Sequence, residues 1–128
     1  MSEESVSRSM MENNVFEFTF SAENDPRKRI PYVAKLKLTD GKITREFYPM
    51  SRTWGHRSVH VYGTYHAQVG DIIEIRWGGS WKNDYRDWYV VNENGQLKMC
   101  CSIYDSEKKF VVLQYLGGKI TLNELLSK

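Results

Sequence analysis

The chain has 128 residues, of which 41% are hydrophobic, 27% charged and 13% aromatic, proportions that are ordinary for a globular domain. It lacks a run of about 18 apolar residues, which excludes a membrane-spanning helix, and its first residues lack the apolar segment of a signal peptide. We therefore expect a single cytoplasmic domain with no membrane contact, large enough to fold without disulfides or metal.

The net charge of +2 hides an uneven distribution along the chain. Residues 1–26 hold one basic and six acidic residues, residues 27–57 hold nine basic and two acidic ones, and residues 58–128 are balanced. A basic third of the chain favours binding to a polyanion. The same distribution would also arise if the acidic leader folds back on the basic segment, or if the lysines simply keep a sheet surface soluble.

Alternation of apolar and polar residues predicts strands through most of the chain. Residues 1–13 are polar and aperiodic, so we expect a disordered acidic leader, followed by a single β domain over residues 14–128. Phe16, Phe18 and Phe20 alternate with polar neighbours and predict the first strand.

The next segment predicts a hairpin. Apolar residues recur at every second position from Ile30 to Leu38, Asp40-Gly41 is a typical two-residue turn, and Ile43 to Tyr48 returns. After Pro49, residues 49–57 are expected to form an irregular loop. Alternation then resumes over residues 58–66.

Strands also account for most of the remaining chain. Gly70-Asp71 leads into an apolar strand that ends at Gly78-Gly79-Ser80, and residues 81–87 are predicted to be a connecting loop. Trp88 to Asn92 and residues 96–104 form a hairpin around Asn94-Gly95. Lys109 to Leu116 is predicted to be a last apolar strand.

Only the last ten residues are predicted to be helical, because Thr121 and Glu124 have the spacing of a capping box. The pattern therefore predicts an all-β fold of seven or eight short strands with one short C-terminal helix. Two architectures fit: a small antiparallel barrel, OB-like or SH3-like, or a two-sheet sandwich.

Aromatic and basic residues gather in two predicted loops and on the first hairpin. Exposed rings beside cations stack on the bases of single-stranded nucleic acid, while lysine and arginine contact its phosphates. The sequence thus predicts a non-enzymatic module that binds single-stranded or irregular RNA or DNA. Its predicted binding residues are Lys35, Lys37, Arg45, Arg52, Trp54, Arg57, Trp81, Lys82, Tyr85 and Arg86.

Two other functions compete with nucleic-acid binding. The same aromatic surface suits a protein partner or a homo-oligomer, since protein interfaces are also rich in tryptophan, tyrosine and arginine. His60 and Tyr62 share a strand face at a separation of roughly 6.6 Å, which would allow metal-independent ribonuclease chemistry by a general base and acid.

Metal and cofactor chemistry has no support in the sequence. His60 and His66 are roughly 20 Å apart on an extended strand, too far to share a metal. Cys100 and Cys101 are adjacent, so we expect reduced thiols on opposite faces of a strand, with packing roles. There is also no nucleotide-binding glycine motif and no hydrolase elbow, so neither a cofactor nor a catalytic residue is predicted.

Overall fold

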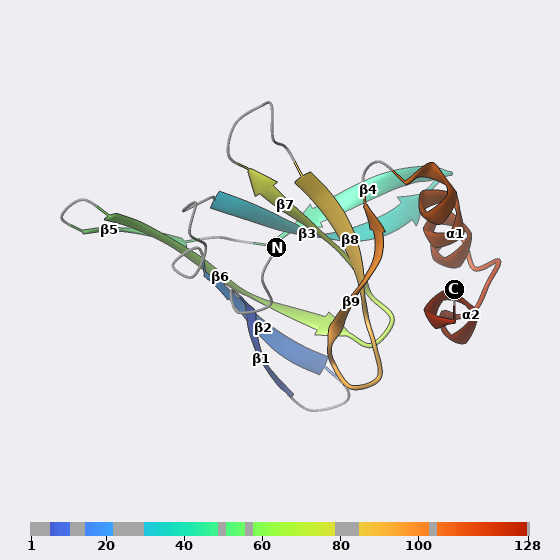
Figure 1. Cartoon of the computed structure of the whole chain (residues 1–128), viewed down its shortest axis with the longest axis horizontal. Helices are drawn as coiled ribbons and strands as arrows, with labels where there is room; N and C mark the ends of the chain where they lie inside the picture. Colours follow the sequence, from blue (N-terminus) through green and yellow to red (C-terminus); the bar gives the residue numbers. More distant parts are fainter. Residues whose placement is uncertain are drawn as a thin grey trace.

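A computed structural model describes residues 6–10, 15–21, 30–48, 51–55, 58–78, 85–102 and 105–127. It describes side chains for 15–18, 33–48, 65–75, 86–102 and 105–127. These parts form antiparallel strands in two sheets, neither closed into a barrel, followed by two short helices at the C-terminal end (Figure 1). The strands are β1 (Val6–Met10), β2 (Val15–Ser21), β3 (Ile30–Thr39), β4 (Lys42–Phe47), β5 (Ser51–Gly55), β6 (Ser58–Gln68), β7 (Ile72–Gly78), β8 (Tyr85–Val91) and β9 (Leu97–Ser102); the helices are α1 (Ser106–Leu116) and α2 (Leu122–Leu126).

The first sheet has four strands in the order β1-β2-β6-β5. The second half of β6 pairs with β2, and the first half pairs with β5. The second sheet has five strands in the order β4-β3-β7-β8-β9. The connection from β6 to β7, which joins the two sheets, turns at Gly70. The φ of Gly70 is 93°, a backbone conformation that glycine adopts readily and other residues rarely adopt.

The main hydrophobic core lies between the two sheets. Phe18 and Tyr65 from the first sheet pack in one cluster with Val33, Ile75 and Val91 from the second. The rings of Phe18 and Tyr65 stack with centroids 5.2 Å apart. The apolar side chains on the facing sides of the two sheets thus bury one another, and this contact excludes water from the core.

A second cluster lies on the other face of the five-stranded sheet, where the helices pack (Figure 1). Leu36, Ile72 and Val90 from the sheet contact Val112 of α1 and Leu125 of α2. We call this side the helix face and the opposite side the inner face. The start of β7, in the middle of the five-stranded sheet, is therefore buried on both sides, which explains its nearly continuous apolar run.

The two predicted hairpin turns, at Asp40-Gly41 and Asn94-Gly95, are confirmed. Asp40 and Gly41 both have positive φ, 51° and 78°, as a two-residue hairpin turn requires. Gly95 has φ of 75°, and the Asn92 side chain accepts hydrogen bonds from the backbone of Asn94 and Gln96. The predicted capping box of α2 is also present, with Thr121 and Glu124 bonded reciprocally.

The barrel is the part of the fold prediction that the structure does not support. The described strands form two separate sheets that share a core, which corresponds to the second of the two expected architectures in its coarse outline. Within the segment expected to be disordered, residues 6–10 form β1 and pair with β2. The other positions of residues 1–13 lie outside the described residues.

Three local predictions were wrong in whole or in part. Residues 81–87 were expected to be a connecting loop, but residues 85–87 belong to β8. Residues 51–55 form β5, although residues 49–57 were expected to be an irregular loop, because this segment pairs with the first half of β6. Residues 106–116 form α1, although Lys109 to Leu116 was expected to be a strand. The helix begins where the side chain of Asp105 accepts from the backbone N–H of Lys108, 3.1 Å away.

The end of α1 is equally well defined. The N–H groups of Gly118 and Lys119 bond to the carbonyls of Tyr115 and Gln114, and Gly118 has φ of 76°. These two bonds form a Schellman motif, a common helix ending at glycine. The Gly117-Gly118 pair therefore ends a helix, whereas the sequence pattern predicted the end of a strand there.

Candidate nucleic-acid interface

The predicted cationic hairpin divides between the two faces of the five-stranded sheet. The register pairs Lys35 with Glu46 and Leu36 with Arg45, so Lys35 and Lys37 lie on the inner face and Arg45 on the helix face. The three residues do not form one surface.

The two lysines have acidic neighbours. Lys35 Nζ lies 3.1 Å from a carboxylate oxygen of Asp71, and Lys37 Nζ lies 3.1 Å from one of Glu46. The Lys37 pair is well exposed, so its net energy is small, but the local charge on the inner face is balanced.

Arg45 takes part in a buried polar network on the helix face. Its Nε and its terminal nitrogen donate to the two carboxylate oxygens of Glu74, at 2.7 and 3.1 Å. The indole N–H of Trp88 donates to the same carboxylate at 2.8 Å. Glu74 is only 1% exposed, so these charge-assisted bonds compensate for removing its charge from water.

The helix face continues with further cations. The β7–β8 register places Arg76 directly opposite Arg86, two positions beyond the Glu74–Trp88 pair. At the other end, Lys98 lies opposite Val90 and donates to the backbone carbonyl of Leu126 at 2.7 Å. We call the positions Arg45, Arg76, Arg86 and Lys98 the cationic face; among the sheet positions on this side that the structure describes, Glu74 is the acidic one.

Helix α1 adds a cation next to this surface. Lys109 Nζ lies 5.5 Å from the centre of the Trp88 ring, within the range of a cation–π interaction. Trp88 is therefore contacted by a carboxylate at its N–H and by an ammonium over its ring.

The predicted loop residues are distributed between the two sheets. Arg52 and Trp54 belong to β5 in the first sheet, while Tyr85 and Arg86 begin β8 in the second. The structure describes the backbone of Arg52, Trp54 and Tyr85 but not their side chains. Arg57, Trp81 and Lys82 lie outside the described residues. Of the ten predicted residues, the register thus places Arg45 and Arg86 on the helix face, and Lys35 and Lys37 on the inner face.

Glu74, Trp88 and Lys109 were not predicted as site residues. The sequence could have indicated Glu74, because it is a charged residue between two isoleucines of an apolar strand. A carboxylate buried in such a strand requires a polar or cationic partner. Lys109 could not be found because its segment was expected to be a strand.

The cysteines pack on the helix face together. Tyr89 lies opposite Met99 and Trp88 opposite Cys101, so Cys100 is the extra residue of a β-bulge. Both thiols therefore contact the helix-side cluster, which corrects the expectation of opposite faces.

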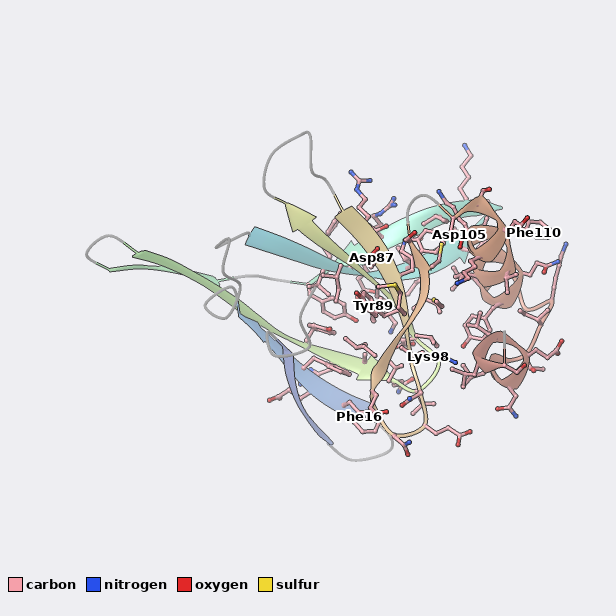
Figure 2. The ribbon with its side chains drawn as sticks, viewed as in Figure 1. Phe16, Asp87, Tyr89, Lys98, Asp105 and Phe110 are labelled. Carbon is pink, nitrogen blue, oxygen red and sulfur yellow. The ribbon has the colours of Figure 1, made fainter. Side chains whose placement is uncertain are left out.

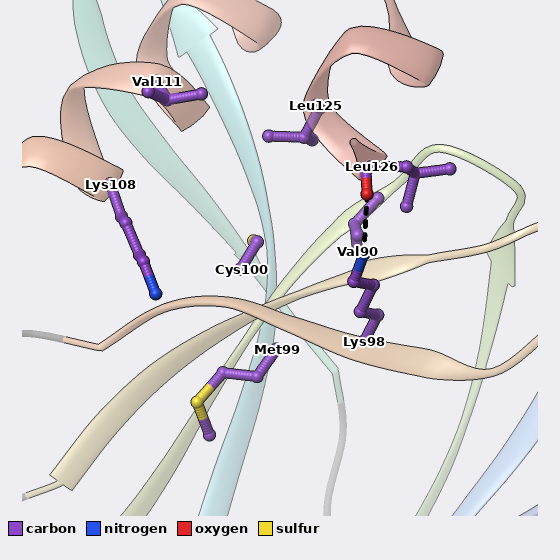
Figure 3. A pocket seen from close by; sticks show the side chains of 8 residues that line it. All are labelled: Val90, Lys98, Met99, Cys100, Lys108, Val111, Leu125 and Leu126. Atoms are coloured by element: carbon purple, nitrogen blue, oxygen red, sulfur yellow. Dashed lines mark hydrogen bonds between the residues drawn. The ribbon is translucent and has the colours of Figure 1, made fainter. Parts of the chain in front are cut away.

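These thiols are free and protonated at neutral pH. Burial raises the pKa of the Cys100 thiol to about 12, with a smaller contribution from the neighbouring Cys101. Burial also raises the pKa of the Cys101 thiol. Cys100 lines a cavity of about 60 Å³ between β9 and the helices (Figure 3). A thiol that keeps its proton is a poor nucleophile and a poor metal ligand.

The histidines give no metal site within the described part of the chain. His66 Nε2 lies 3.1 Å from the Glu17 carboxylate on the neighbouring strand, and no group of three metal-ligating side chains occurs among the described residues. His60 and Tyr62 lie on β6, but their side chains are not described, so the ribonuclease hypothesis stays a prediction. His56 lies outside the described residues.

Comparisons with protein-family models, with curated proteins and with solved structures find no match to this chain. None of the described helices is long and apolar enough to cross a membrane. The function therefore has to be argued from the charges and contacts of the site itself.

Proposed function

We propose that this chain is a non-enzymatic module that binds single-stranded or irregular nucleic acid on the helix face of its five-stranded sheet. The observation that carries the proposal is the charge of that face: the cationic face holds four basic positions, against the single carboxylate of Glu74 among the described sheet positions. Phosphate groups are the ligands that such an excess of cations attracts over distance.

The Arg76–Arg86 register pair supports this proposal further. The register places these two arginine positions directly opposite each other on neighbouring strands, so the positive charge of the helix face is concentrated at this end of the sheet. Guanidinium groups also suit phosphate because they donate two parallel hydrogen bonds. By contrast, Lys35 and Lys37 lie on the inner face beside carboxylates, and they are no longer the first candidates for phosphate contact.

Base stacking is the second part of the proposal. Trp54, Trp81 and Tyr85 keep this predicted role, each with about 1–3 kcal/mol per stacked base. Under this proposal, phosphates contact the cationic face and bases stack on exposed rings.

The test is fluorescence anisotropy of a labelled 12-nucleotide single strand at two salt concentrations. Arg86→Gln and Lys109→Gln should each weaken binding and reduce the slope of log K against log salt by about 0.7, the value for one lost contact to a single strand. Lys37→Gln removes the same charge from the inner face and should leave affinity and slope unchanged. Thermal unfolding of each variant checks that the fold is retained.

Absence of binding at low salt, or equal effects of the three substitutions, would overturn the proposal.

A protein partner is the second candidate, and exposed apolar side chains favour it. Phe110 is 61% exposed on the outer side of α1 (Figure 2). Met99 is 52% exposed on β9. Self-association that persists at high salt and is lost in Phe110→Ser would support this candidate, because apolar contacts are not screened by salt.

A further inference from the structure

The turn between β8 and β9 contains the one Asn-Gly pair of the sequence, Asn94-Gly95. An asparagine followed by glycine can modify itself without an enzyme, because the next backbone nitrogen attacks the side-chain amide and glycine has no Cβ to hinder that approach. The structure describes this turn with its side chains, and Asn94 is exposed to solvent. The sequence and the exposure together indicate that Asn94 is a reactive residue.

The reaction at Asn94 needs water and no other reagent. Hydroxide removes the N–H proton of Gly95, the nitrogen forms a bond to Cγ of Asn94, and the Cγ–Nδ2 bond breaks as ammonia leaves with a proton from water. The product is a succinimide ring. Water then adds to one of the two ring carbonyls, and ring opening gives either aspartate or isoaspartate, in which the backbone runs through Cγ.

The native turn holds the attacking nitrogen in a hydrogen bond. The N–H of Gly95 donates to the backbone carbonyl of Asn92 at 2.9 Å. The N–H groups of Asn94 and Gln96 donate to Oδ1 of the Asn92 side chain, at 3.0 and 2.9 Å. Asn92 thus accepts the three successive backbone N–H groups around the reacting bond, and the Gly95 proton cannot be removed without breaking one of these hydrogen bonds.

Packing against the first sheet restricts the same nitrogen further. Gly95 is buried, and the ring of Phe16 on β2 fills the space that a Cβ at position 95 would take. Backbone rotations that move the Gly95 nitrogen have to displace this ring or break the hydrogen bonds to Asn92. The reaction therefore requires a local opening of the turn.

We propose that Asn94 is a self-modification site controlled by the β8–β9 turn. Asn92 and Phe16 keep residue 94 as asparagine in the folded chain, and opening of the turn allows the succinimide to form. Because ammonia leaves, the change is not reversed when the turn closes again. The extent of conversion therefore measures how long a chain has spent with this turn open, whatever ligand the cationic face binds.

The isoaspartate product does not fit the native turn. It lengthens the backbone between positions 94 and 95 by one atom, so the hydrogen bonds to Asn92 and the contact of Gly95 with Phe16 cannot all form again. The modified chain should unfold at a lower urea concentration than the unmodified chain. Ion-exchange chromatography separates the two by the added negative charge, and equal urea midpoints would contradict this fit argument.

The main test follows residue 94 by peptide mass mapping of the full chain, incubated at mildly alkaline pH in buffer and in urea. A synthetic peptide of residues 90–99 is incubated in the same solutions. In buffer, Asn94 of the folded chain should convert at least about tenfold more slowly than in the peptide, and in urea the two rates should agree. Asn123, which Glu124 follows in α2, is the internal control and should stay unmodified in both solutions.

Variants at Asn92 separate opening of the turn from unfolding of the whole chain. Asn92→Ala removes the acceptor of the Asn94 and Gln96 N–H groups and should speed conversion in buffer about fivefold. Asn92→Asp keeps a side-chain oxygen there and should stay close to the native rate. Asp105→Ala removes the α1 cap instead and should leave the rate at Asn94 unchanged.

Three results would overturn the proposal. They are conversion in the folded chain as fast as in the peptide, no acceleration in Asn92→Ala, and an acceleration in Asp105→Ala equal to that in Asn92→Ala. Thermal unfolding checks that each variant is folded, and the comparison of the native chain with the peptide needs no variant.

Discussion

Gly95, at the turn between β8 and β9, lies directly against the ring of Phe16 on β2. A Cβ at position 95 would overlap the ring carbons, and the backbone there has φ of 75°. Phe16 is buried at 6% exposure beside this turn (Figure 2). The backbone of one sheet and an aromatic ring of the other therefore meet at a place where a side chain does not fit.

Substitution of Gly95 by alanine should destabilise the fold strongly. Positive φ costs about 1 kcal/mol for a residue with a Cβ, and displacing a buried ring adds about 1–3 kcal/mol. Chemical denaturation should give a loss of about 2–4 kcal/mol in the free energy of unfolding. Gly41→Ala is the matched control, because position 41 also has positive φ but open space around it; a loss as large there would contradict the overlap argument.

The Arg45–Glu74 pair should matter far more than the Lys37–Glu46 pair. Arg45→Gln leaves the buried Glu74 carboxylate without its bidentate partner and should cost about 2 kcal/mol, a value reduced because the guanidinium is a third exposed. Lys37→Gln should change the free energy of unfolding by less than about 0.5 kcal/mol. Denaturant titrations at pH 7 compare the two, and similar losses would argue against the buried network.

The Asp105 side chain should stabilise α1 from its first turn. Asp105→Ala removes the acceptor for the Lys108 N–H and should cost about 1 kcal/mol. Asp105→Asn keeps an acceptor and should restore most of that loss. If alanine and asparagine behave alike, residues 106–116 do not begin a helix at this position.

Cys100 should make stability fall at high pH. Its pKa is raised from 9.0 to about 12, so between these values the folded chain keeps a proton that the unfolded chain has lost. The corresponding stability is complete below pH 9 and is lost as the pH rises towards 12. The difference in unfolding free energy between the native chain and Cys100→Ala should therefore shrink over this window, and a constant difference would show that the thiol is not buried as described.

Much of the second sheet could be predicted because its signals are local. The Asp40-Gly41 turn alone fixes Thr39 opposite Lys42, and hence Lys35 opposite Glu46, so the separation of Arg45 from the two lysines was already implied by the sequence. Grouping the three cations by strand proximity overlooks that separation.

Other elements depend on distant partners or on competing patterns. Residues 51–55 have no clear alternation, and they become a strand by pairing with β6. In α1, Val111, Val112, Tyr115 and Leu116 fit one helical face as well as they fit an apolar strand, and the Asp105 cap decides between the two.

The pairing of β2 with β6 also affects how the chain folds during synthesis. Val15 pairs with Gln68, so β2 emerges from the ribosome long before β6, its partner on the side away from β1, while β3 can pair with β4 at once. Phe16 and Phe18 remain without their core neighbours during that interval. Newly made chains aggregate through apolar side chains that are exposed in this way. We therefore expect β2 to be a segment that a chaperone protects during synthesis.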